Sequence, residues 1–88
     1  MKNTYKSEVK EVIEYMNDKY TKNFRHKGKY VQHYTTKLLQ DYSVEEIKAV
    51  IDNRYNAWIC VPVMHKYFRP STIFDPSNFS KYFDDTFN

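Results

Sequence analysis

The side chains that could do chemistry in this sequence are three histidines, one cysteine and a run of cations. His26, His33, His65 and Cys60 are possible soft metal ligands, but their spacings match no zinc pattern. An enzyme would need a nucleophile with a base, a carboxylate pair, a phosphate-binding loop or a metal. The single glycine excludes the glycine-rich phosphate loops. We therefore expect no metal, no cofactor and no catalysis, and predict a protein that acts by binding.

The cations are concentrated in the middle of the chain. From Lys19 to Lys37 there are six basic residues and no acid, while the whole chain carries a net charge of +3. Basic groups neutralise phosphates and exposed rings stack on unpaired bases. The predicted phosphate contacts are Lys22, Arg25, Lys27, Lys29 and Lys37, and the candidate stacking rings are Tyr20 and Tyr30. This basic patch is read in three ways: a sequence-nonspecific DNA contact, a solvated loop, or a surface for an acidic protein.

Helical periodicity predicts the elements that carry these residues. Apolar residues recur at 3.6-residue spacing in helices expected over residues 7–20, 30–41 and 44–59. Ser7 is the expected N-cap of the first helix. Ser43 and Glu46 have the spacing of a capping box, and Pro62 should end the third helix shortly before it.

Prolines punctuate the last quarter of the chain. Pro70 predicts a short turn over residues 71–74, and Asp75 followed by Pro76 predicts the start of a final helix. Asp84 and Asp85 would lie at the wrong pole of that helix dipole, so its end should fray. The predicted fold is all-α: a small compact bundle of about four helices with a proline-punctuated C-terminal segment, and one domain over residues 1–88.

The composition is rich in rings and poor in small residues. Nine Tyr and six Phe accompany two Leu, two Ala and one Gly, so aromatic bulk should supply much of the core. Cys60, beside Trp58, is expected to be a buried small hydrophobe. The longest uncharged apolar run, residues 57–64, is too short for a membrane span, and the charged N-terminus does not resemble a signal peptide. We expect a soluble intracellular protein with no membrane contact.

Several segments together resemble a known family. They are residues 12–17 (VIEYMN), 23–25 (NFR), 50–53 (VIDN), Trp58, 64–74 (MHKYFRPSTIF), Phe79 and 82–83 (YF). This pattern resembles the conserved C-terminal domain of phage replication proteins, the replisome organisers with DnaD-like character. The resemblance covers about residues 9–83, and its most specific part is the stretch from Tyr67 to Phe74. The sequence departs from the family pattern at two places: it lacks a glycine near residues 41–42, and Val61 stands where the family has an acidic residue.

The resemblance implies a role in phage DNA replication, in the cytoplasm of a bacterial host. In that family the domain is associated with single-stranded DNA or with the helicase-loading machinery, so DNA and a helicase or its loader are the implied partners. The alternative is a small antagonist that binds a host replication or defence protein. The oligomeric state stays open.

The bulky residues of the resembling segments have two interpretations. Trp58, Tyr67, Phe68 and Phe74 pack in the core, or they are exposed and bind a partner. Arg69 is expected to tie to a carboxylate such as Asp52 rather than to a phosphate. Arg25 belongs both to the resembling segments and to the basic patch, so it is the cation favoured for function.

Overall fold

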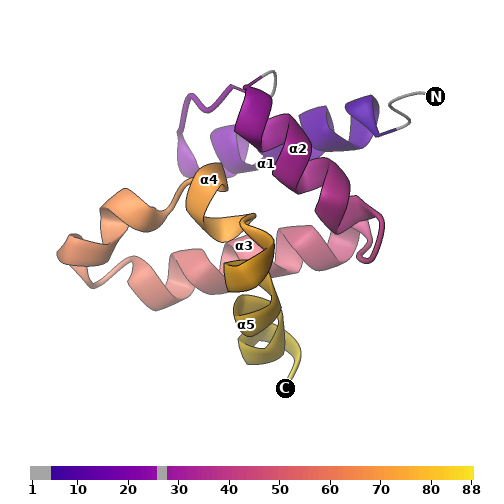
Figure 1. Cartoon of the computed structure of the whole chain (residues 1–88). Helices are drawn as coiled ribbons and strands as arrows, with labels where there is room; N and C mark the ends of the chain where they lie inside the picture. The colour runs from indigo at the N-terminus through magenta and orange to yellow at the C-terminus, as the bar shows by residue number, and fades with distance from the viewer. Residues whose placement is uncertain (1–4, 26–27) are drawn as a thin grey trace.

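In a computed structural model, residues 5–25 and 28–88 are described, and within these ranges the chain forms helices and no strand. The elements in chain order are α1 (Lys6–Tyr20), α2 (Lys29–Leu39), α3 (Val44–Trp58), the 3₁₀-helix η1 (Pro62–Tyr67), α4 (Pro70–Ile73) and α5 (Pro76–Phe87). The all-α fold is therefore confirmed. Figure 1 shows α3 lying across the middle of the molecule, with η1 projecting at one end.

The core forms where α1, α2, α4 and α5 meet around α3. Helix α3 packs on α1 and α5, and α2 packs on α1, α4 and α5. The centre of the core is more aliphatic than the composition predicts, because the fully buried side chains of α1 and α3 are Val, Ile and Met. The buried rings come mainly from the second half of the chain: Trp58, Phe68, Phe74 and Phe79. Most of the tyrosines are only partly buried and pack around this centre.

Two predicted helix starts have the expected caps. The Ser43 hydroxyl accepts from the Glu46 amide, and the Glu46 carboxylate accepts from the Ser43 amide, which completes the capping box of α3. Asp75 accepts from the Ser77 amide and Pro76 takes the first helical position of α5. The N-cap predicted at Ser7 is wrong: α1 begins at Lys6, and Tyr5, which packs against the core, precedes it without a side-chain cap.

The helix ends differ more from prediction. Helix α3 ends at Trp58, and the following segment winds into η1, a helix that the sequence pattern does not indicate. The acidic end of the last helix, which was predicted to fray, is helical here, since α5 continues through Phe87. Its acidic end is tied back to α3, because Asp85 lies 3.3 Å from the Arg54 guanidinium. That guanidinium also lies 4.5 Å from the Tyr82 ring, so one cation joins the two helices.

Candidate nucleic-acid interface

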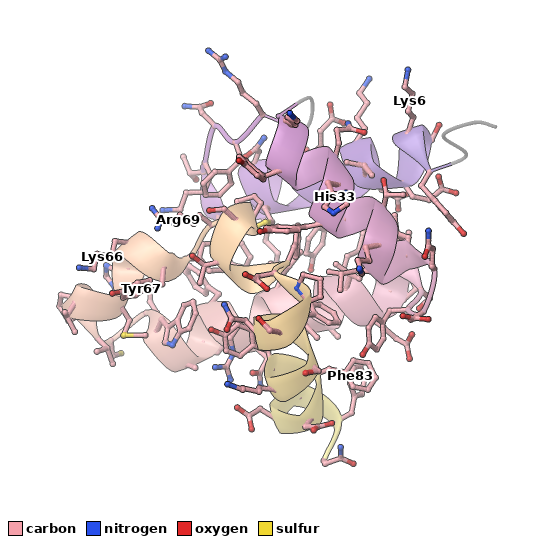
Figure 2. The ribbon with its side chains drawn as sticks, in the orientation of Figure 1. Lys6, His33, Lys66, Tyr67, Arg69 and Phe83 are labelled. Carbon is pink, nitrogen blue, oxygen red and sulfur yellow. The ribbon has the colours of Figure 1, made fainter. Side chains whose placement is uncertain are left out.

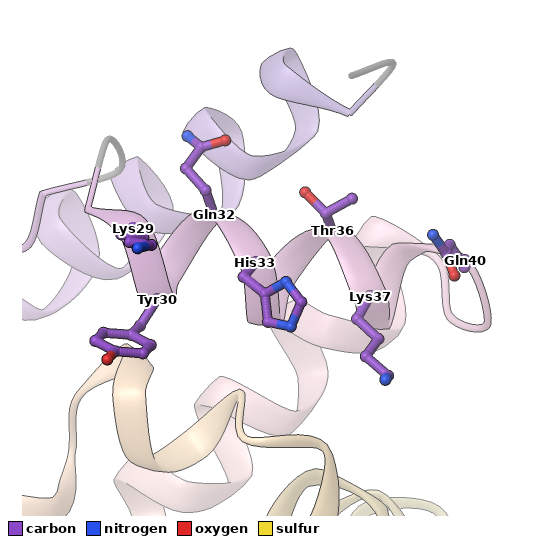
Figure 3. Close-up of a pocket in the computed structure, with 7 residues that line it drawn as sticks. All are labelled: Lys29, Tyr30, Gln32, His33, Thr36, Lys37 and Gln40. Atoms are coloured by element: carbon purple, nitrogen blue, oxygen red, sulfur yellow. The ribbon is translucent and has the colours of Figure 1, made fainter. Parts of the chain in front are cut away.

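One face of α2 gathers cations and an open ring. Lys29, His33 and Lys37 follow one another at four-residue spacing, and Tyr30 lies between the first two with 67% of its surface exposed. Figure 3 shows Tyr30, His33 and Lys37 pointing to the same side of the helix. From Gly28 to Gln40 the sequence has no acid. We call Lys29, Tyr30, His33 and Lys37 the α2 face.

The packing of α2 fixes which way this face points. Thr35 and Leu38 are buried against the rest of the protein, and at 100° per residue Lys29, His33 and Lys37 lie on the opposite side. The residues around the shallow space over this face all come from α2 and its C-terminal cap: Lys29, Tyr30, Gln32, His33, Thr36, Lys37 and Gln40. Because a single helix supplies them, the α2 face is an open surface rather than a cleft. Such a surface suits a polymer that lies across it.

The remaining cations of the predicted basic patch do not all join this face. Lys19 lies 3.2 Å from the Asp52 carboxylate, so its charge is already paired. Lys22 points elsewhere, with its ammonium 5.9 Å from the centre of the Phe68 ring. Arg25 is exposed in the α1–α2 connection. Lys27 and His26 lie outside the described residues.

A side-chain clamp holds the connection that carries Arg25. The Asn17 amide accepts from the Phe24 amide at 2.8 Å and donates to the Phe24 carbonyl at 3.0 Å. Thr21, at φ 56°, turns the chain out of α1. Both clamped residues belong to the segments that carry the family resemblance, but nothing in their spacing indicates this pairing.

Asp52 on α3 is the acceptor for three groups of α1. It accepts hydrogen bonds from the hydroxyls of Tyr15, at 2.6 Å, and Tyr20, and it pairs with Lys19. Burial opposes its charge, but the three donors outweigh this effect and lower the pKa of Asp52. Burial and the hydrogen bond to Asp52 raise the pKa of both tyrosines.

The prediction of an ion pair between Arg69 and Asp52 is wrong, because other groups already occupy the Asp52 carboxylate. Three donors from α1 occupy the Asp52 carboxylate, while the Arg69 Nε donates to the Thr72 hydroxyl at 3.2 Å. Arg69 therefore stabilises the start of α4 and remains exposed to solvent.

The two candidate stacking rings have different surroundings. Tyr20 stacks on Tyr55, with ring centroids 4.0 Å apart, and meets Phe68 edge-on at 5.2 Å. Its hydroxyl is bound to Asp52. Among the ring contacts of the described residues, Tyr30 has a tilted one with Tyr34, at 6.2 Å, and it is the more open of the two rings.

The bulky residues of the resembling segments are divided between core and surface. Trp58, Phe68 and Phe74 are buried, and Tyr67 is partly buried. Trp58, Phe68 and their neighbours surround a hollow of about 130 Å³, which we call the aromatic hollow; its lining residues are Tyr20, Lys22, Tyr55, Trp58, Ile59, His65 and Phe68.

Beyond this hollow the chain exposes an apolar loop. Residues 59–63 run from the end of α3 into the first residues of η1, and we call them the apex; all five are exposed. The burial predicted for Cys60 is wrong, because Trp58 is the last side chain of α3 to turn inward and the chain then leaves the core. The His65 ring holds the apex in place through a 2.9 Å hydrogen bond from Nε2 to the Ile59 carbonyl.

Among the described residues, no helix is long and apolar enough to cross a membrane. Comparison with curated proteins finds no match, and comparison with solved structures finds none. A family model described as a conserved phage C-terminus matches residues 12–84, most of the chain. These residues include α2, α3, the apex and α4, so the match covers the arrangement described above. The chain therefore belongs to the family of conserved phage C-terminal domains.

Proposed function

We propose that this phage domain is a DNA-replication accessory that acts by binding DNA, single-stranded DNA in particular, and not by catalysis. The observation that carries the proposal is the α2 face, where two lysines and a histidine flank an exposed tyrosine on an acid-free helix. Lysines at this spacing follow a phosphate backbone, and Tyr30 offers its ring to an unpaired base. Arg25, exposed in the clamped connection that precedes α2, is proposed as a third phosphate contact.

The test is fluorescence anisotropy with labelled single- and double-stranded oligonucleotides, titrated with salt. If Lys29, Lys37 and Arg25 each meet a phosphate, log affinity for a single strand falls with log salt at a slope of about −2. Lys29→Ala/Lys37→Ala should bring the slope to about −0.7, because two of three contacts are lost. Tyr30→Ala should weaken single-strand binding by roughly 1–3 kcal/mol without changing the slope.

A matched control removes the same charge elsewhere. Lys10 on α1 and Lys81 on α5 are exposed, so Lys10→Ala/Lys81→Ala lowers the net charge equally without touching the α2 face. Equal loss of affinity in the two double variants, or no binding at low salt, contradicts the proposal.

We also propose a replicative helicase or its loader as a protein partner, because the sequence resembles phage replisome organisers. Surface plasmon resonance with the purified host helicase and loader tests this part separately from DNA binding. A complex that survives Lys29→Ala/Lys37→Ala would indicate a second surface for the protein partner.

A second candidate function is antagonism of a host replication or defence protein. The observation that favours it is the apex, because five consecutive exposed residues without charge are typical of protein contacts. This function predicts a stoichiometric complex with one host protein and no salt-dependent DNA binding.

A further inference from the structure

The apex exposes three large apolar side chains to solvent. Val63 is 66% exposed, Ile59 43% and Val61 39%. Scattered apolar residues are normal on protein surfaces, but here these three alternate with exposed Cys60 and Pro62 and adjoin the aromatic hollow, which Ile59 also lines. The apex and the hollow therefore form one continuous surface.

The stretch of chain that forms most of this surface carries charges of one sign, while Asp52 beside Tyr20 and Asp85 beside Arg54 are already paired. Between Asp52 and Asp75 the sequence contains no acid. Arg54 is occupied by Asp85, which leaves Lys66 and Arg69 as the exposed cations of this stretch. Figure 2 shows both at the η1 end of the molecule. Lys22 adds a third cation at the hollow, above the Phe68 ring.

The size of the aromatic hollow limits what enters it. An apolar cavity of about 150 Å³ accommodates one benzene molecule, and sites for drug-sized ligands start near about 300 Å³. At about 130 Å³ the hollow matches one large apolar side chain. Tyr20 and Tyr55 stack on each other, so one face of each ring is already covered.

We propose that the apex and the aromatic hollow together are a docking surface for an acidic segment of another protein. One large apolar side chain of that segment enters the hollow, and its carboxylates lie against Lys22, Lys66 and Arg69. Charge complementarity favours this occupant over a second copy of the chain, which would bring the same cations into contact. The proposal concerns a surface other than the α2 face, so it stands or fails independently of DNA binding.

A random dodecapeptide library, displayed and selected against the full chain, tests the chemistry of the occupant. The enriched peptides should combine one Phe, Leu or Trp with several Asp or Glu residues. A Trp-free enriched peptide should change the fluorescence of Trp58, the only tryptophan, which lines the hollow.

Variants then locate the site. Lys66→Glu/Arg69→Glu and, separately, Val63→Asp should each weaken that peptide at least about tenfold. Lys10→Glu/Lys81→Glu, with the same change in net charge, should leave its affinity within about twofold. All these side chains are exposed, and circular dichroism checks that each variant remains helical.

Four results would overturn the proposal. The enriched peptides could lack acids, or the apex variants could bind them as well as the wild type. Single-stranded DNA could quench Trp58 and compete with the peptide, which would assign the hollow to nucleic acid instead. Concentration-dependent dimers lost in Val63→Asp would assign the apex to a second copy.

Discussion

Replacing Asp52 by Asn tests how α1 is fixed to α3. The carboxylate accepts from the Tyr15 and Tyr20 hydroxyls and pairs with Lys19. Asn keeps the shape and one acceptor oxygen but removes the charge. The substitution therefore isolates the charge-assisted part of these interactions.

The expected cost follows from the burial of the site. Hydrogen bonds to a charged group contribute about 1.5–3 kcal/mol each. The Asp52 side chain is 30% exposed and that of Lys19 49%, so the ion pair itself adds little. We expect Asp52→Asn to lower the free energy of unfolding by about 2 kcal/mol at pH 7. For a domain of this size that is a fall in Tm of roughly 8–16 °C.

The pH dependence of this cost has a definite sign. The pKa of Asp52 is lowered in the folded protein, so its contribution is fully present above its unfolded pKa and is lost as the pH falls through the folded value. Urea unfolding followed by circular dichroism, at pH values from 7 down to 2, should show the wild type and Asp52→Asn converging below about pH 4.

The same experiment can refute the reasoning. A difference in free energy that stays constant to pH 2 would mean that Asn disturbs packing, and that the carboxylate charge is not what holds α1. Tyr20→Phe is the matched control, because it removes one donor and leaves the Asp52 carboxylate free to ionise. Its cost should lie at the lower end of the range for one such hydrogen bond, at about 1.5 kcal/mol.

Three further predictions concern the stability of the fold. Ser43→Ala should cost about 1 kcal/mol in urea unfolding because it removes the capping box of α3, whereas Ser7→Ala should cost nothing; equal losses would contradict the assignment of caps. Thr35→Val should raise the free energy of unfolding by up to about 1 kcal/mol, because the buried Thr35 hydroxyl has no hydrogen-bond partner among the described residues; a loss of stability would reveal a partner. Phe74→Ala should cost about 3–5 kcal/mol and lower Tm steeply, while Phe87→Ala, half exposed, should cost under about 1 kcal/mol; similar costs would contradict the placement of the core.

The sequence predicted the helices well because their signals are local. Periodicity located α1, α2 and α3, and the caps at Ser43 and Asp75 were identified from spacing alone. The errors occurred where tertiary contacts decide. Tyr5 extends α1 past Ser7, and Arg54 secures the acidic end of α5.

The candidate site was only partly predictable. A run of cations in the sequence does not show which way each side chain points. Lys19 and Lys22 therefore fall in the same predicted patch as Lys29 and Lys37, although the fold separates them. The four-residue spacing of Lys29, His33 and Lys37 could have indicated one helix face. The Asp52 contacts could not have been foreseen, because they join residues more than thirty positions apart.

The central place of α3 has a consequence for how the domain opens. Because α3 packs on α1, α5 and η1, its amides at Ile47, Val50 and Ile51 should exchange with deuterium only when the whole domain unfolds. Helix η1 has no fully buried residue and only Met64 and Tyr67 pack partly against the core, so it should unwind at a lower free-energy cost than α3. The end of the domain that bears the apex can thus reshape itself around a partner while the rest stays folded, and its amides should exchange fastest among those of the described helices.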